Sequence, residues 1–142
     1  MLSYYSPFSV TASSYFVDNL FKLTLNQPVI EEPGKKFKYK SIATQLLAIV
    51  ISKATGKNLS EYLFESFWNP MGFENEALWQ IDSKKNGIEK GFCCLASNAR
   101  DFARFGKLYK DYGKWYGEKL LDSLFVVKSL KPRFLESPEY GY

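Results

Sequence analysis

The chain has 142 residues, 46% hydrophobic and 18% aromatic, a composition that suits one globular domain with bulky rings in its core and excludes a disordered chain. Its net charge of +4 is spread over 19 basic and 15 acidic residues without a concentrated arginine face, so we expect no nucleic-acid partner. Histidine is absent, which excludes Ser-His-Asp triads, Cys-His pairs and histidine zinc sites, and we predict no metal and no cofactor.

The apolar runs are short, and none approaches the roughly 18 residues that cross a bilayer. We therefore expect no membrane span. Residues 1–5 lack the basic region followed by an apolar run that marks an export signal, and the localisation stays open. Cys93 and Cys94 are neighbours, and a disulfide between neighbours closes an eight-membered ring that distorts the peptide bond, so we predict packed or free thiols that identify no compartment.

The first predicted helix covers residues 12–25, with Ser13 or Ser14 as its N-cap. Its apolar residues recur at roughly helical spacing: Phe16, Leu20, Phe21 and Leu23. Asn26-Gln27-Pro28 ends it, and a connection follows that closes on the turn signal Pro33-Gly34.

A basic loop, residues 33–41, ends in Tyr39-Lys40-Ser41 at the start of the next helix. A tyrosine fixed just before a helix can act as a general base. Because a phenol ordinarily ionises near pH 10, this role needs neighbouring cations, and Lys38 and Lys40 flank Tyr39. The alternative is a plain turn in which Ser41 is the helix N-cap and the lysines are solvated.

The helix that begins at Ile42 is apolar around most of its circumference, so we expect it to be buried on most sides and to end at a left-handed Gly56. Another helix follows, with a capping box of Asn58 and Glu61 and a stop at Asn69-Pro70. Its expected inward stripe is Leu59, Tyr62, Leu63 and Phe67.

Strand-forming residues at 78–81 and 91–95 predict a small hairpin around an Asn86-Gly87 turn. Ser97 or Asn98 then caps a helix that ends at Gly113, residues 115–117 make a turn, and residues 120–128 form a short final helix. The predicted fold class is mainly α with a small β-hairpin.

Two groups of residues have a functional and a structural interpretation. Four residues of the predicted hairpin line a substrate cleft in the functional interpretation and are packing residues in the structural one. They are Trp79, Phe92, Cys93 and Cys94. Arg100, Asp101 and Arg104 form a polar patch, or else a solvated helix face with local ion pairs. We favour packing for the first group and a solvated face for the second.

Several short motifs occur in one order, and together they resemble the middle, mostly helical section of the serine β-lactamase and penicillin-binding-protein-like family, in the branch of class C-related esterases, amidases and peptidases. The resemblance runs from about Pro7 to Tyr142. Its motifs are Pro33-Gly34-x-x-Phe37-x-Tyr39-x-Ser41, Gln45-Leu46-Leu47, Ala54-Thr55-Gly56-Lys57, Leu59-Ser60-Glu61-Tyr62, Trp68-Asn69-Pro70-Met71-Gly72, Ala77-Leu78-Trp79 and Ala99-Arg100-Asp101-Phe102-Ala103-Arg104-Phe105-Gly106.

The resemblance implies a catalytic role for Tyr39 and Ser41. In that family the serine of a Ser-x-x-Lys motif attacks a carbonyl, and its lysine shuttles the proton together with a tyrosine. Tyr39 matches this tyrosine, and Ser41 stands where asparagine is commonest, so a hydrogen-bonding group is kept while the amide donor is removed. Lys85-Asn86-Gly87 matches a later Lys-x-Gly triplet only formally, because it falls in the predicted hairpin turn.

No serine in the sequence has a lysine three positions on; Ser97 comes nearest, with Arg100. The resemblance thus implies a single partial domain, residues 1–142, that is the helical lobe of a β-lactamase-like fold without most of its central sheet. We expect a fragment of a serine hydrolase for an ester, amide or peptide substrate, inactive alone. The alternative is a noncatalytic helical module that binds a ligand or forms a homo-oligomer through exposed helix faces. Intact family members are often exported.

Overall fold

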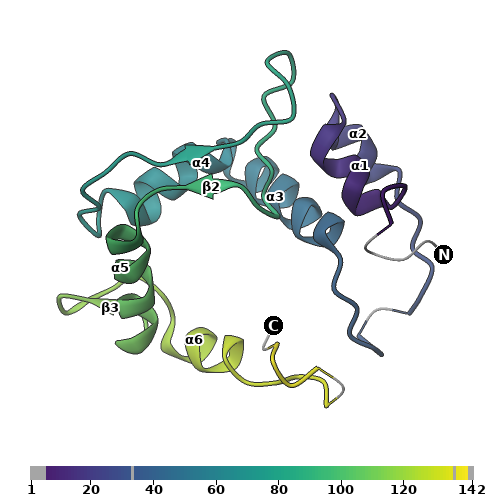
Figure 1. Cartoon of the computed structure of the whole chain (residues 1–142). Helices are drawn as coiled ribbons and strands as arrows, with labels where there is room; N and C mark the ends of the chain where they lie inside the picture. Colours follow the sequence, from purple (N-terminus) through teal and green to yellow (C-terminus); the bar gives the residue numbers. More distant parts are fainter. Residues whose placement is uncertain (1–5, 33, 136, 141–142) are drawn as a thin grey trace. The chain divides into compact units, whose positions relative to one another are not determined.

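The computed structural model describes residues 6–32, 34–135 and 137–140, so Pro33 of the basic loop lies outside the described residues, as do residues 1–5. The described residues form two compact units. The first consists of residues 6–31, 39–63 and 77–96, and the second of the remaining described segments, 32–38, 64–76 and 97–140 with the gaps just named. The chain is mostly helical with short antiparallel strand pairs, as predicted (Figure 1).

The first unit begins with two helices, α1 (Val10–Phe16) and α2 (Leu20–Leu25), which both contact α3 (Ser41–Thr55) (Figure 1). The prediction of one helix over residues 12–25 is therefore wrong. Val17 is extended, and Asn19 caps a new helix by accepting a bond from the Lys22 N–H at 2.8 Å. The Leu20 N–H donates to the Asp82 carboxylate at 3.0 Å, so a hydrogen bond to the hairpin fixes the start of α2.

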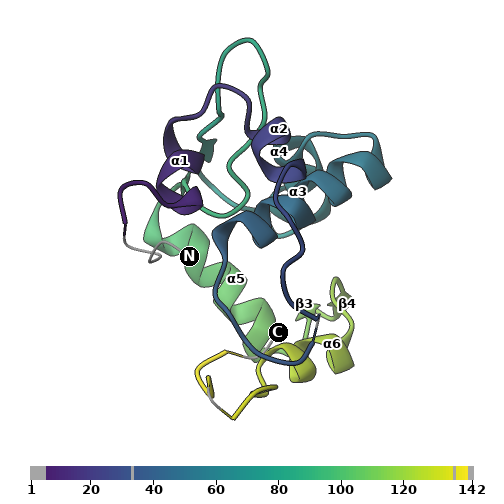
Figure 2. The ribbon, with the colours of Figure 1, turned by 90° about the vertical axis from the view of Figure 1, so that its right-hand side faces the viewer.

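Helix α3 ends at Gly56, whose φ of 70° confirms the left-handed cap. The expectation that α3 is buried on most sides is wrong for the described residues. One side, which includes Gln45, Ala48 and Ile49, is buried in contact with α1, α2 and α4 (Leu59–Leu63) (Figure 2). The other side exposes a row of large apolar side chains: Leu46, Leu47, Val50 and Ile51. We call these four residues the apolar face of α3.

Helix α4 begins with the predicted capping box. The Glu61 N–H donates to the Asn58 side chain at 2.8 Å, and the Asn58 N–H donates to the Glu61 carboxylate at 3.2 Å. The inward stripe is only partly confirmed, since Leu59 is buried and Tyr62 is exposed. The chain continues as the π-helix η1 (Phe64–Trp68) and stops at the predicted Asn69-Pro70.

The predicted hairpin is confirmed. Strands β1 (Leu78–Trp79) and β2 (Leu95–Ala96) pair antiparallel with Trp79 opposite Leu95, and an isolated bridge joins Ile81 to Glu89. Residues 83–87 form the turn, in which the Gly87 N–H donates to the Ser83 carbonyl at 2.9 Å. Lys85-Asn86-Gly87 is thus a turn, as expected.

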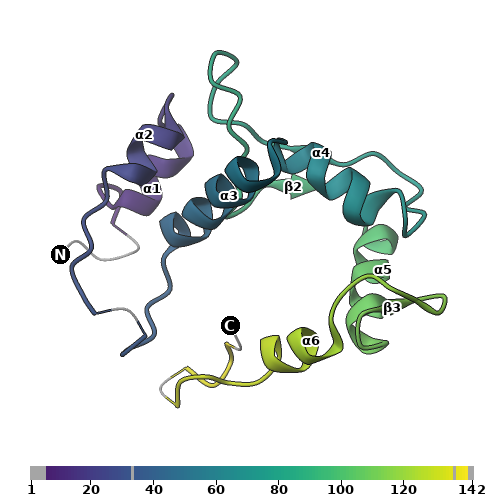
Figure 3. The same cartoon turned by 180° about the vertical axis from the view of Figure 1, so that it is seen from behind.

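The second unit centres on α5 (Ala99–Lys110), which Asn98 caps and which contacts β3 (Lys114–Trp115) (Figure 3). Strand β4 (Glu118–Lys119) pairs with β3 across a turn at Tyr116-Gly117, and Trp115, predicted to lie in this turn, belongs to β3. The last helix, α6 (Ser123–Ser129), begins three residues later than expected because Asp122 is its N-cap. Met71, Leu108 and Trp115 form the core of this unit.

Candidate functional site

Tyr39 and Ser41 stand at the beginning of α3, on either side of an extended Lys40. The Tyr39 side chain is 50% exposed, whereas Ser41 is 3% exposed and is the first residue of the helix. The interpretation of Ser41 as the N-cap is wrong: Lys40 holds that position, with no side-chain cap bond. Lys38 and Lys40 are both exposed. An accessible phenol therefore lies next to a buried hydroxyl at a helix start.

Gln45, one turn beyond Ser41 and 0% exposed, fixes the hairpin to α3. Its Nε2 donates to the Glu89 carbonyl at 3.0 Å, and its Oε1 accepts from the Gly91 N–H at 2.8 Å. A Cβ added at Gly91 would lie 2.4 Å from the Cβ of Ala48, so the hairpin backbone lies directly on the helix. Gly91 permits this approach because it has no side chain.

Glu89 extends the same connection to α4. Its carboxylate is buried and accepts from the Ser60 N–H at 3.2 Å and from the Ser60 hydroxyl at 3.0 Å. Beside it lies a cavity of about 170 Å³, lined by Phe21, Lys53, Ile88 and other residues of α2, α3 and α4. Neither Tyr39 nor Ser41 lines this cavity, so it is separate from the predicted catalytic pair.

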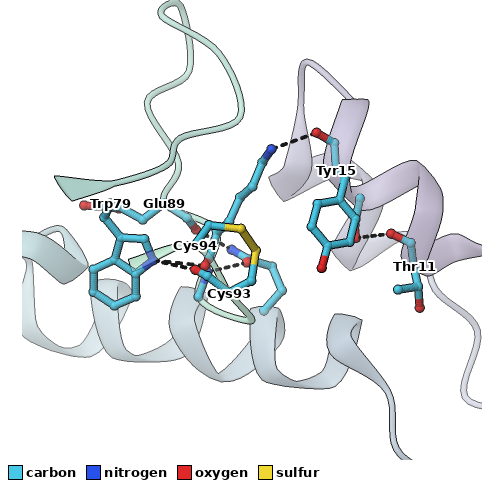
Figure 4. Close-up of a disulfide and its surroundings, with 10 residues drawn as sticks. Thr11, Tyr15, Trp79, Glu89, Cys93 and Cys94 are labelled. Atoms are coloured by element: carbon cyan, nitrogen blue, oxygen red, sulfur yellow. Dashed lines mark hydrogen bonds between the residues drawn. A yellow bond between two sulfur atoms is a disulfide. The ribbon is translucent and has the colours of Figure 1, made fainter. Parts of the chain in front are cut away.

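Lys90 is the largest fully buried side chain among the described residues, with 2% exposure. Its ammonium donates to the Tyr15 carbonyl at 2.7 Å and lies 5.9 Å from the centre of the Tyr15 ring (Figure 4). Phe92 packs edge-on against the same ring at 5.3 Å. No sequence pattern predicts this buried cation, because its partner is a backbone carbonyl 75 residues away.

Cys93 and Cys94 form a disulfide, and the prediction of separate thiols is wrong (Figure 4). The two cysteines lie in a turn that local residue types do not reveal, in which the Cys93 N–H donates to the Lys90 carbonyl at 3.0 Å and Cys94 has a φ of 71°. The Trp79 indole N–H donates at 3.0 Å to the carbonyls of both Lys90 and Cys93. These bonds hold the Trp79 indole against the backbone of the hairpin.

In the second unit, Asp101 is fully buried, so the prediction of a solvated face is wrong for this residue. Its carboxylate accepts from the N–H groups of Glu74 and Asn75, each at 3.0 Å, and pairs with Arg104. Burial raises the pKa of Asp101, but these hydrogen bonds and the Arg104 charge outweigh it, and the pKa lies below the usual 3.8. Arg100 is exposed, as expected.

No helix in the described part of the chain combines the length and apolar character needed to cross a membrane. Within the same residues, no group of three or more histidine, cysteine or acidic side chains is placed to hold a metal ion.

The β-lactamase family profile matches residues 2–135. Among solved structures, one named "Putative 6-aminohexanoate-dimer hydrolase from Bacillus anthracis" has a TM-score of 0.71 and 30% identity, covering 79% of this chain and 29% of that one. Another, named "Crystal structure of putative beta-lactamase from Bacteroides dorei DSM 17855", has a TM-score of 0.68 and 20% identity. The match covers 82% of this chain and 35% of that one.

The chain thus spans about a third of the length of these structures. No curated protein matches it. The family match covers nearly all of the sequence, including Tyr39 and Ser41, both units and the hairpin. The chain belongs to the β-lactamase family.

Proposed function

We propose that this chain is the helical part of a serine hydrolase that transfers an acyl group from an ester, amide or peptide substrate to water. Tyr39 is the proton-shuttling residue of the intact enzyme, and Ser41 is its hydrogen-bonding neighbour. The observation that supports this best is the exposed Tyr39 beside the buried Ser41 at the start of α3, inside the matched family region. The Bacillus anthracis structure, whose name refers to an amide dimer, favours a small amide as substrate.

The proposal also holds that the chain alone is inactive, because its sequence has no serine followed by a lysine at the third position. A serine nucleophile needs an adjacent base, and without one it stays protonated and weak. Incubation with a fluorophosphonate probe should therefore leave the chain unlabelled by intact mass. A probe adduct mapped to any serine would overturn this part of the proposal.

The role of Tyr39 is tested in the longer protein, if the DNA before Met1 encodes an in-frame Ser-x-x-Lys. There Tyr39→Phe should lower kcat by about 10²–10⁴-fold, the usual contribution of a general acid–base group. Tyr112→Phe is the matched control, since Tyr112 is also exposed but lies in the second unit. Equal activity of the two variants would contradict the assignment.

A second function, a noncatalytic module that binds a ligand or associates with another copy, is favoured by the apolar face of α3. An exposed row of Leu, Val and Ile is typical of an interaction surface. Loss of binding to a cell-wall peptide or glycan when Tyr39 and Trp79 are changed, with hydrolysis never detected, would favour this function over catalysis.

A further inference from the structure

We propose that Cys93 and Cys94 are a reversible redox site, and that their reduction by a thiol opens the turn of residues 92–94. The pair takes no part in the acyl-transfer chemistry proposed above. Both cysteines are half-buried, so a small thiol can reach the sulfur atoms. They lie in the hairpin of the first unit, where the Trp79 indole bonds to the Cys93 carbonyl (Figure 4). The Gln80 N–H bonds to the Cys94 carbonyl.

The reaction is an ordinary thiol–disulfide exchange. One thiolate of an external dithiol attacks a sulfur of the pair and breaks the Cys93–Cys94 bond, which gives a mixed disulfide and one free thiolate. The second external thiol then displaces the protein sulfur. The protein gains two electrons and two protons as a dithiol, and the external dithiol loses them and becomes a disulfide.

The backbone of Cys94 explains why the turn responds. Its φ of 71° lies in the left-handed region, which residues with a side chain rarely adopt. In the oxidised chain the ring ties this side chain to the preceding residue and limits the dihedral angles that it can adopt. After reduction that restraint is gone, and Cys94 can return to a negative φ.

A change of φ at Cys94 turns the carbonyls on either side of it. The Cys94 carbonyl accepts from the Gln80 N–H at 3.1 Å, and the Cys93 carbonyl accepts from the Trp79 indole at 3.0 Å. Both bonds are therefore lost when the turn opens. The indole keeps its second bond, to the Lys90 carbonyl, so Trp79 stays attached to the hairpin.

The opening stops at Gly91. The Gly91 N–H is held by the buried Gln45 side chain, and the Gly91 backbone lies against Ala48 of α3. Neither contact involves a sulfur atom or the dihedral angles of Cys94. Reduction should thus release the amide of Gln80 and leave that of Gly91 protected.

The experiment compares hydrogen exchange of single amides in the ¹⁵N-labelled chain before and after dithiothreitol, with thiols counted by a colorimetric reagent. We expect no free thiol before reduction and two after it, with a mass increase of two hydrogen atoms. Exchange at Gln80 should rise about tenfold or more through local opening, while exchange at Gly91 and at Leu108 in α5 stays unchanged. Reoxidation should restore the original rates.

Two double variants separate the loss of the disulfide from the effect of the backbone. Cys93→Ser with Cys94→Ser should exchange like the reduced chain. Cys93→Ser with Cys94→Gly should keep the protection of the oxidised chain, because glycine adopts a positive φ readily. The proposal is overturned if the air-exposed chain carries two free thiols, if reduction leaves exchange at Gln80 unchanged, or if the glycine variant opens as fully as the serine variant.

Discussion

Single residues decide how closely the hairpin lies on α3. Gly91→Ala should lower the free energy of unfolding by about 1–3 kcal/mol, because the new methyl group would overlap Ala48 and overpacked sites cost that much. Gly106→Ala is the matched control. No atom lies within 4 Å of a Cβ added at Gly106. Because glycine destabilises a helix interior relative to alanine, the free energy of unfolding should rise by roughly 0.5–1 kcal/mol. Urea unfolding followed by circular dichroism measures both.

The clash can be tested directly by removing its other side. If overlap with Ala48 is the cause, Ala48→Gly should be less damaging in the Gly91→Ala background than in the wild type. The coupling energy from this double-mutant cycle isolates the contact. Additive effects of the two substitutions would show that Gly91 matters for another reason.

The buried Asp101 makes stability depend on pH at the residue scale. Its pKa is lower in the folded chain than the 3.8 of an unfolded one, so the unfolded state binds the proton first as the pH falls. The contribution of the ionised Asp101 to the free energy of unfolding is complete above about pH 5. It is lost as the pH falls through 3.8 toward the lower pKa of Asp101 in the folded chain.

Asp101→Asn should therefore destabilise the second unit at pH 7 and have a smaller effect at pH 3. The measurement is urea unfolding at both values, followed by the fluorescence of Trp68 and Trp115, which lie in the same unit. Glu118→Gln, at an exposed position in β4, is the control. A difference between wild type and Asp101→Asn that is equal at both pH values would refute the assignment.

At the scale of elements, Gln45 connects α3 to the hairpin through two buried hydrogen bonds. Gln45→Leu leaves the Glu89 carbonyl and the Gly91 N–H without this partner, and each unpaired group costs about 1–3 kcal/mol. We therefore expect the free energy of unfolding to fall by roughly 3 kcal/mol. Gln27→Leu should cost less than about 1 kcal/mol, because its amide makes one hydrogen bond, to the Leu23 carbonyl, and this bond is only partly buried. Chemical unfolding measures the free energy of unfolding of the two variants. Similar losses in both would argue against Gln45 as a connection between α3 and the hairpin.

Elements whose signals are local agree well with the sequence. The Asn58–Glu61 capping box, the Gly56 cap and the Asn86-Gly87 turn each depend on residues within a few positions, and the structure contains all three. Where a distant group intervenes, the predictions fail. Residues 12–25 form two helices partly because Leu20 bonds to Asp82, a partner 62 residues away that no periodicity reveals.

At the scale of the whole molecule, the apolar face of α3 is exposed. Because such a surface is costly in water, we expect the chain to bind a hydrophobic dye and to associate at micromolar concentration. Leu47→Lys with Val50→Glu should shift sedimentation toward the monomer and reduce dye binding severalfold. Lys84→Glu, at an exposed position of the hairpin turn, should leave both unchanged. A strictly monomeric wild-type chain that binds no dye would contradict this expectation.

The family was predictable from the sequence because its signals are short motifs in a fixed order, and the profile match over residues 2–135 agrees. The positions of Tyr39 and Ser41 before a helix also followed from local residues, whereas their catalytic role stays a prediction. What surrounds them did not follow. Gln45 lies in an apolar stretch, and only the fold shows that both ends of its amide are bonded to the hairpin.

The sequence by itself thus determined most of the helices, the Gly56 cap, the Asn58–Glu61 capping box, the hairpin and the family, since these depend on neighbours along the chain. The tertiary structure alone decided that Lys90 and Asp101 are buried, that the apolar face of α3 is exposed, and that Cys93 and Cys94 are joined. Burial depends on which distant groups come together, and a polar side chain enters the interior only where such groups bond to it.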